Sequence, residues 1–192
     1  MKRSLGPRTL VYPTPAFLVG TYDAAGKPNV MTAAWAGICC SRPPCVAVSL
    51  RKATYSHGSI LERRAFTISV PSAEQVREAD YAGIYSGRDR NKLEVLGLTA
   101  VASELVAAPY VAECPLVLEC ELRHVHELGL HTQFVGEILD VKAEEATLDE
   151  RGLPLIEKVD PLIYATGDQS YYRVGPRVAR AFSVGRETDQ DP

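Results

Sequence analysis

The 192-residue sequence lacks the features that mark several common protein classes. Its formal net charge is −3, whereas a general nucleic-acid binder needs a concentrated basic face. No apolar run approaches the ~18 residues that a membrane-spanning helix requires. The N-terminal sequence MKRSLGPRTL has no apolar segment after its positive charges, so it is unlike a secretory signal. We therefore expect a cytoplasmic protein that binds neither nucleic acid nor membranes.

Three common nucleotide and nucleophile motifs are also missing. The sequence has no G-x-G-x-x-G after a strand-like run, so a classical dinucleotide-binding crossover is not supported. It has no Walker loop, and no G-x-S-x-G segment of the kind that presents a nucleophilic serine. These absences argue against the three enzyme classes that depend on such motifs.

The five cysteines form no recognisable redox or metal-binding motif. They include neither a C-x-x-C pair nor a metal-like quartet, and their number is odd. Cys39 and Cys40 are adjacent, which is a poor geometry for a disulfide. Cys45 and Cys120 lie in strand-like apolar runs, so we expect both to be small buried side chains.

Two histidines, His124 and His126, alternate along one strand-like run and would point to the same face. Such a pair can bind a metal, but no third ligand is evident nearby. A surface or hydrogen-bonded pair is favoured, and we expect no metal site.

The residues that are present are typical of one globular domain. Hydrophobic residues make up 46% and charged residues 23%, which is average for such proteins. Strand-like runs linked by short turns outnumber helical segments, which favours a barrel over a doubly wound sheet. We expect a single domain over residues 1–192, with an N-terminal arm (1–9) and a disordered tail (186–192).

Apolar periodicity and turn residues predict the main elements. The turn Asp23–Gly26 predicts a hairpin, and Ser72 with Gln75 has the spacing of a capping box. The predicted strands are Ala16–Tyr22, Asn29–Ile38, Cys45–Leu50, Ala65–Val70, Leu98–Leu105, Leu116–His126 and His131–Ala143. The predicted helices are Tyr55–Arg63, Ala73–Tyr81 and Lys92–Leu96.

The stretch Asn29–Thr54 is the first candidate binding region. It carries small residues that leave room for a flat molecule against the backbone: Thr32, Ala33, Ala34, Ala36 and Gly37. The next run ends on Ser49, Arg51 and Thr54, whose hydroxyls and guanidinium suit a phosphate. A helix N-terminus after Thr54 would add free N–H groups and a favourable dipole. The alternative is a buried hairpin with ordinary small residues and a capping Ser or Thr.

The loop Ile84–Lys92 is the second polar cluster. It contains Ser, Gly and three basic residues, and such a loop can close over a phosphate. On composition alone a solvated turn before the short helix is favoured.

The motif N-x-M-T-A-A-W…S-x-P-P…V-S-L-R-x-x-T, which begins at Asn29, resembles the flavin reductase-like family, and the flavoredoxin branch most of all. Three later segments fit the same family: S-G-x-x-x-x-K from Ser86, G-x-H-x-x-x-x-G-E-I from Gly129 and D-P-L-I-Y from Asp160. The resemblance covers about Pro15 to Val184. It implies an all-β dominated fold with a few helices, a split β-barrel of Greek-key type that binds FMN.

The resemblance also implies which residues bind the cofactor. Those assigned to the isoalloxazine are Asn29, Met31, Thr32, Ala33, Ala34 and Trp35. Those assigned to the ribityl-phosphate are Ser49, Arg51, Thr54, Ser86, Gly87 and Lys92, and Leu50 is counted with the cofactor-binding set. Two alternatives stay open: Trp35 as a buried core aromatic and Arg51 as a surface ion pair. The thiol of Cys40 could touch the flavin.

The function implied is an FMN-dependent oxidoreductase that transfers hydride from NADH or NADPH to the flavin. His131 is the candidate catalytic residue that guides the nicotinamide; a structural His131, bonded to a backbone carbonyl, is equally supported. Electrons would pass to an acceptor or a partner oxygenase. The alternatives are a flavoredoxin-like FMN electron carrier reduced by a protein donor, and a flavin-free binding module. We also expect a homodimer, because such barrels leave exposed apolar edges.

Overall fold

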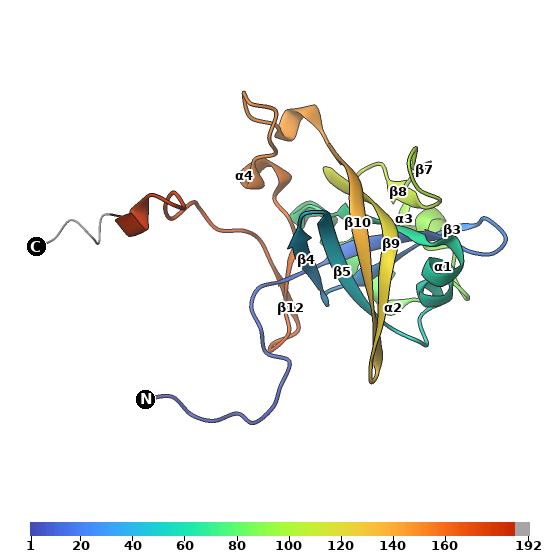
Figure 1. Ribbon diagram of the computed structural model, residues 1–192, viewed down its shortest axis with the longest axis horizontal. Helices are drawn as coiled ribbons and strands as arrows, with labels where there is room; N and C mark the ends of the chain where they lie inside the picture. The colour runs from blue at the N-terminus through green and yellow to red at the C-terminus, as the bar shows by residue number, and fades with distance from the viewer. Residues whose placement is uncertain (187–192) are drawn as a thin grey trace, which may run out of the picture.

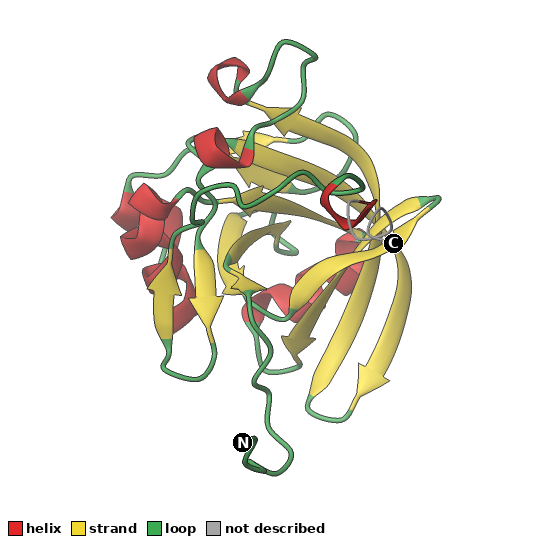
Figure 2. Cartoon of the chain, turned by 90° about the vertical axis from the view of Figure 1, so that its left-hand side faces the viewer, coloured by secondary structure: helices red, strands yellow, loops and turns green. Residues whose placement is uncertain are grey.

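A seven-stranded antiparallel sheet forms the body of the protein in the computed structural model, which describes residues 1–186. The order of its strands is β3-β2-β6-β9-β10-β5-β4. Their bounds are β2 Phe17–Tyr22, β3 Pro28–Ala33, β4 Ala36–Ser41, β5 Pro44–Arg51, β6 Ala65–Val70, β9 Leu116–Leu128 and β10 His131–Ala143. Since β3 also contacts β5, the sheet curls into a barrel, with the helices distributed around it (Figure 2). The predicted all-β dominated fold with a few helices is confirmed.

Short turns join the paired strands. Between β2 and β3, Gly26 adopts a positive φ of 81°, and the Lys27 backbone N–H donates to Asp23 Oδ1 at 2.8 Å. The β9–β10 hairpin turns at Gly129, which also has a positive φ, and is the longest in the fold described (Figure 1). Glycine suits both positions because it has no Cβ to oppose this backbone conformation. The predicted hairpin at residues 23–26 is confirmed.

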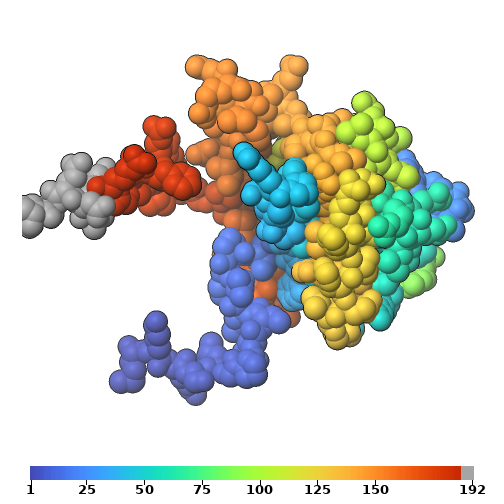
Figure 3. Space-filling view, in the orientation of Figure 1, coloured from blue at the N-terminus to red at the C-terminus, as the bar shows by residue number. Residues whose placement is uncertain are grey.

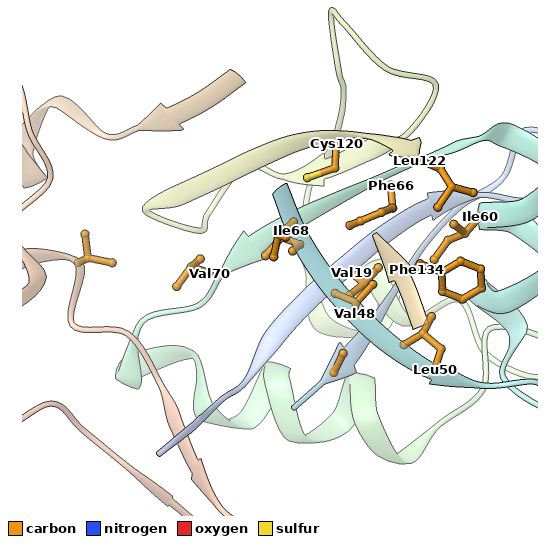
Figure 4. Close-up of a cluster of buried hydrophobic side chains, with 13 residues drawn as sticks. Val19, Val48, Leu50, Ile60, Phe66, Ile68, Val70, Cys120, Leu122 and Phe134 are labelled. Atoms are coloured by element: carbon orange, nitrogen blue, oxygen red, sulfur yellow. The ribbon is translucent and has the colours of Figure 1, made fainter. Parts of the chain in front are cut away.

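The barrel interior is a continuous apolar core. Phe66 and Phe134 are its largest fully buried side chains, and Val19, Ile68 and Leu122 pack with them (Figure 4). Cys45 and Cys120 are buried as predicted. Burial of each large apolar side chain stabilises the fold by about 1.5–3 kcal/mol, so this core holds the strands in place.

Helices and short strands complete the fold. The helices are α1 Tyr55–Arg63, η1 Ala73–Gln75, α2 Val76–Ile84, α3 Lys92–Leu96, η2 Glu145–Thr147 and α4 Ile156–Val159. The short strands are β1 Thr14–Pro15, β7 Ala100–Ala102, β8 Pro109–Val111, β11 Ile163–Ala165 and β12 Ser170–Tyr172. A second apolar cluster, with Val30, Ala82 and Leu93, packs α2 and α3 against the outer face of β3. This packing brings the end of α2 and the start of α3 to the same side of the barrel.

Three predicted elements differ from the structure. The predicted strand Leu98–Leu105 is reduced to β7, Ala100–Ala102. The predicted strand Asn29–Ile38 is interrupted at Ala34 and Trp35, and β4 then runs along the far edge of the sheet beside β5. The Ser49 N–H donates to the Trp35 carbonyl at 2.8 Å, which fixes this crossing. The predicted helix Ala73–Tyr81 begins as a 3₁₀ turn and continues to Ile84. Its capping box is present, with the Ser72 N–H bonded to Gln75 Oε1 at 2.9 Å.

The N-terminal arm and the described segment after β12 extend away from the barrel (Figure 3). The predicted arm, residues 1–9, is exposed and has no regular secondary structure. The segment after β12 is also exposed, and it carries Val178 and Phe182. The predicted tail lies outside the described residues apart from Arg186. Within the described part of the chain, no helix is long and apolar enough to cross a membrane.

Candidate functional site

A cavity of about 320 Å³, here called the Lys92 cavity, lies where β3, α1, α2 and α3 converge. It is lined by Asn29, Met31, Arg51, Ala53, Thr54, Tyr55, Ser56, Ala82, Gly83, Ile84, Tyr85, Ser86, Gly87, Arg88 and Lys92. Its basic groups are Arg51 at the end of β5, Arg88 in the loop between α2 and α3, and Lys92 at the start of α3, and its hydroxyl groups are those of Thr54, Tyr55, Ser56, Tyr85 and Ser86. Its size is within the range of small-molecule sites.

Helix α1 begins at the wall of this cavity. Thr54 is its N-cap, and Thr54, Tyr55 and Ser56 all line the space. The first N–H groups of a helix have no partner within the helix, and they carry the positive end of its dipole. The buried Ser56 hydroxyl accepts a hydrogen bond from Asn29 Nδ2 at 3.0 Å, which orients the Asn29 amide on β3. The helix start can therefore stabilise an anion.

Lys92 places a buried cation in the same cavity. Its side chain is 3% exposed, and Nζ donates to the Ala82 carbonyl at the end of α2, at 2.9 Å. An ammonium has three donors, so two remain for a ligand. Burial lowers the pKa of Lys92 from 10.5 to about 8, because the charged form loses hydration. A bound anion would supply the charge that this ammonium needs.

The loop before α3 fits closely against the other walls. Gly87 is buried, and a Cβ at this position would collide with the Asn29 side chain and the Tyr55 ring. Arg88 Nη1 donates to the Ala53 carbonyl at 2.9 Å. The Asp89 N–H closes the turn by donating to the Ser86 carbonyl at 3.1 Å. The predicted loop therefore contributes Ser86, Gly87 and Lys92 to the wall of the cavity, while Asp89, Arg90 and Asn91 between them are exposed.

A second cavity of about 380 Å³, here called the Tyr171 cavity, adjoins the first at Gly83 and Ile84. Its other lining residues are Ala16, Thr32, Ala34, Asp80, Tyr164, Gln169 and Tyr171. The Tyr171 hydroxyl donates to Asp80 Oδ1 at 3.1 Å. Burial and this hydrogen bond to a carboxylate raise the pKa of Tyr171. The hairpin β11–β12 thus meets α2 at this end.

The structure brings most of the predicted cofactor residues together at the two cavities. The Lys92 cavity contains Asn29, Met31, Arg51, Thr54, Ser86, Gly87 and Lys92. The Tyr171 cavity contains Thr32 and Ala34. Side chains alternate between the two faces of a strand, so consecutive residues of β3 point into different spaces. Thr32 also donates a hydrogen bond to the Ala79 carbonyl of α2.

Five predicted residues line neither cavity. Ala33 and Leu50 are buried in the barrel core, so their side chains belong to its packing. Ser49 is half-buried in β5. Trp35 is 38% exposed, which corrects the alternative of a buried core aromatic. His131 is half-buried at the start of β10, directly opposite Arg51 on β5.

Arg51, Cys40 and the histidine pair each had more than one possible role in the sequence, and their contacts are as follows. At the end of β5, the ion pair found among the described residues joins Lys52 and Glu127 at 2.6 Å and leaves out Arg51. Cys40 is exposed on β4 and lines neither cavity. His124 and His126 stack with ring centres 6.1 Å apart, and residues 1–186 contain no group of three side chains arranged to hold a metal.

Several lining residues were not predicted. Tyr55 and Ser56 follow the predicted cap Thr54 directly, and Arg88 lies inside the predicted loop, so proximity along the chain was a usable signal. The Ala82–Gly83 segment has no such signal, because it lies in an ordinary apolar part of α2, whereas Ile84 and Tyr85 begin the predicted loop Ile84–Lys92. Only its packing against β3 brings it to the site.

Comparison with known proteins identifies the family. The family described as "Flavin reductase like domain" matches residues 8–173 of the chain. The chain belongs to this family. The flavin reductase-like match covers all the strands of the barrel and both cavities.

Solved structures of this family superpose on most of the chain. Flavoredoxin of Desulfovibrio vulgaris (Miyazaki F) is 61% identical with a TM-score of 0.93, covering 96% of this chain and 100% of its own. Flavoredoxin from Methanosarcina acetivorans is 32% identical with a TM-score of 0.92, covering 98% and 99%. An FMN-binding protein from Thermus thermophilus is 27% identical with a TM-score of 0.78, covering 94% and 98%. These matches confirm the predicted split-barrel fold.

Proposed function

We propose that the protein binds FMN at the two adjoining cavities and acts as a flavoprotein oxidoreductase. The observation that carries this proposal is the buried Lys92 ammonium at one end of a cavity that also holds a helix N-terminus. A buried cation without an anionic partner is costly, so the arrangement supports a phosphate ligand. Gly87 supports it as well, because the close loop packing leaves no space for a side chain there.

The donor set suits each part of this cofactor. Lys92, Arg51 and the start of α1 would hold the phosphate, with the hydroxyls of Thr54 and Ser86 as further donors. Among the other predicted residues at the cavities, Asn29, Met31, Thr32 and Ala34 would contact the ring system, and Gly87 would lie beside the ribityl-phosphate. The bound flavin supplies the redox chemistry, while the protein positions it and controls water access.

The first candidate function is reduction of the bound flavin by NADH or NADPH, followed by electron transfer to an acceptor or partner oxygenase. Membership of a flavin reductase-like family supports it. His131 would orient the nicotinamide from the start of β10, opposite Arg51 on β5. No general base is required for hydride transfer, so the residues at the cavities need only bind and orient.

The second candidate is an FMN electron carrier that receives its electrons from a protein donor. The 61% identity to a flavoredoxin over nearly the whole chain favours it. The position of His131 outside both cavities also favours it, because no other residue has been assigned to the nicotinamide. The flavin-binding residues would be the same in both candidates.

Absorption spectra of the purified protein test this proposal. Flavin bands at roughly 370 and 450 nm, present at purification or after addition of FMN, are expected for either candidate. Bleaching by NADH or NADPH under argon supports the reductase. Bands that persist with both nucleotides but bleach with dithionite support the carrier. A protein that stays colourless after incubation with FMN contradicts both and leaves the flavin-free module.

We further propose that the protein is a homodimer. Exposed apolar side chains on the terminal segments and on β4 support this, among them Val178 at 99%, Phe182 at 93% and Ile38 at 70% exposure. Sedimentation equilibrium of the full chain tests it. A monomer at micromolar concentration, with and without FMN, contradicts it.

A further inference from the structure

Arg88 lies where two cavities meet. The Lys92 cavity and a third cavity of about 470 Å³, here called the His57 cavity, share Thr54, Tyr55 and Arg88. The other residues of the His57 cavity are Asp23, Ala24, Ala25, Lys52, His57, Gly58, Ser59 and Glu62. The three shared residues therefore form the partition between the two spaces.

The partition is held by a small set of polar contacts. Arg88 Nη1 bonds the Ala53 carbonyl at 2.9 Å, which ties the loop before α3 to the turn before α1. The guanidinium carbon lies 5.7 Å from the centre of the Tyr55 ring. The Tyr55 hydroxyl in turn donates to Asp23 Oδ2 at 2.6 Å. Arg88 itself is exposed, so its removal would open the partition without disturbing the core.

We propose that Arg88 is a specificity-determining residue that closes the phosphate end of the Lys92 cavity and selects flavin mononucleotide over flavin dinucleotide. The inference rests on the proposed function. A mononucleotide ends at the phosphate, beside Lys92 and the start of α1. A dinucleotide continues with a second phosphate and an adenosine, and the space beyond the phosphate site is the His57 cavity, behind Arg88 and Tyr55.

The positive charge of Arg88 and its steric closure of the partition should have opposite effects on the binding of the dinucleotide. Arg88 is a cation near the phosphate site, so loss of its charge alone should weaken both anionic ligands. If Arg88 closes the partition, its removal should instead make the dinucleotide bind more tightly. The dissociation constant of FAD itself therefore distinguishes the two effects. A change in the ratio of the FMN and FAD dissociation constants would not distinguish them.

Fluorescence titration of the apoprotein with FMN and FAD tests the inference. We expect Arg88→Ala to lower the dissociation constant of FAD about tenfold, the usual scale of one steric contact in a pocket, and to raise that of FMN. Arg90→Ala is the matched control, because it removes the same charge from the same loop, where Arg90 lies over the Tyr85 ring instead. In this control, FAD should bind no more tightly than in the wild type.

The outcomes separate this inference from the proposed function. A wild type that binds FMN, together with an unchanged or raised FAD dissociation constant in Arg88→Ala, overturns the role of Arg88 alone. Equal affinity of the wild type for FMN and FAD also overturns it. Failure of the wild type to bind either flavin overturns both proposals. Arg88→Lys keeps the charge without the planar stacking on Tyr55, so an intermediate FAD affinity is expected.

Discussion

The Lys92 and Tyr171 cavities adjoin at the end of α2, but their polar groups are held differently. In the Lys92 cavity, the ammonium and the Asn29 amide are almost fully buried, and each is bonded to a neighbouring element. In the Tyr171 cavity, the main polar contact joins Tyr171 to Asp80 near the surface. One end is fixed by burial, and the other depends on a hairpin added late in the chain.

This difference suggests that the two ends of the proposed flavin site have different roles, with flavin binding at one end and electron transfer at the other. Preorganised, buried donors lose little freedom when an anion binds, so the Lys92 end is suited to affinity. The Tyr171 end is more open, and an acceptor or donor of electrons can approach there. We therefore expect substitutions at the Lys92 end to change flavin affinity much more than substitutions at the Tyr171 end.

Replacement of Lys92 should have the largest effect. Lys92→Met removes a buried charged donor, and we expect FMN affinity to fall about 100-fold, or about 2.7 kcal/mol. Because burial of the charge opposes folding at neutral pH, the apo variant should be at least as stable to urea as the wild type. Fluorescence titration and urea unfolding measure the two quantities. The exposed Lys27→Met is the control; an equal loss of affinity there would contradict the assignment.

Gly87→Ala tests whether the close packing of the loop matters. The added Cβ collides with Asn29 and Tyr55, so the loop must shift away from the cavity. We expect FMN affinity to fall about 30-fold and the free energy of unfolding to fall by about 1–3 kcal/mol. Gly58→Ala is the control, because a Cβ at that position of α1 meets no atom within 4 Å. The control should be neutral or slightly stabilising, since alanine favours a helix.

The contrast between the two ends also explains what the sequence could predict. The Lys92 end is encoded by short motifs. Residue type and position indicated a phosphate site at Arg51 and Thr54, and the family resemblance added Ser86 and Lys92, whose loop by composition alone favoured a solvated turn. Apolar alternation likewise predicted the barrel strands, with the split between β3 and β4 as the main error. The Tyr171 end depends on long-range packing of α2 against the β11–β12 hairpin, as between Asp80 and Tyr171, which are 91 residues apart in the sequence. No local pattern carries that contact.

Strand geometry bears on the predicted cofactor residues that line neither cavity. The motif names consecutive residues of β3 and β5, but alternate side chains of a strand face opposite sides. Leu50 consequently falls in the core while its neighbour Arg51 lines a cavity. Ala33 also falls in the core, although it shares a face of β3 with Asn29 and Met31. The alternation is visible in the sequence. Which face of each strand lines a cavity depends on where α2 packs, and no local pattern shows this.

Arg51→Ala should have a smaller effect than Lys92→Met, because Arg51 is exposed at the mouth of the cavity. We expect FMN affinity to fall about tenfold, the lower range for a charge-assisted hydrogen bond. Lys52→Ala is the matched control, since its neighbouring ammonium is paired with Glu127 instead. Equal losses in the two variants would indicate a general charge effect. An unchanged affinity in Arg51→Ala would remove Arg51 from the site.

The pH dependence of FMN binding should reflect Lys92. Its pKa is lowered to about 8 in the free protein, and a bound phosphate should raise it. Binding then requires the protonated form, so affinity should be level below pH 8 and fall as pH rises above 8, by up to about tenfold per pH unit. Titrations between pH 7 and 9.5 measure this. Lys92→Met should show no such decline; a decline of equal slope in that variant would assign it to another group.

Tyr171→Phe should have the smallest effect on FMN affinity, and it therefore tests most directly the contrast between the Lys92 and Tyr171 cavities. The change removes the hydrogen bond to Asp80 but keeps the ring, and one exposed neutral-to-carboxylate bond contributes about 1 kcal/mol or less to stability. We expect FMN affinity to change by less than about threefold, since the buried donors at the Lys92 end are untouched. Stopped-flow reduction of the bound flavin is expected to be more sensitive, because this end is open to the electron donor. A loss of affinity as large as that of Lys92→Met would show that both ends hold the flavin equally.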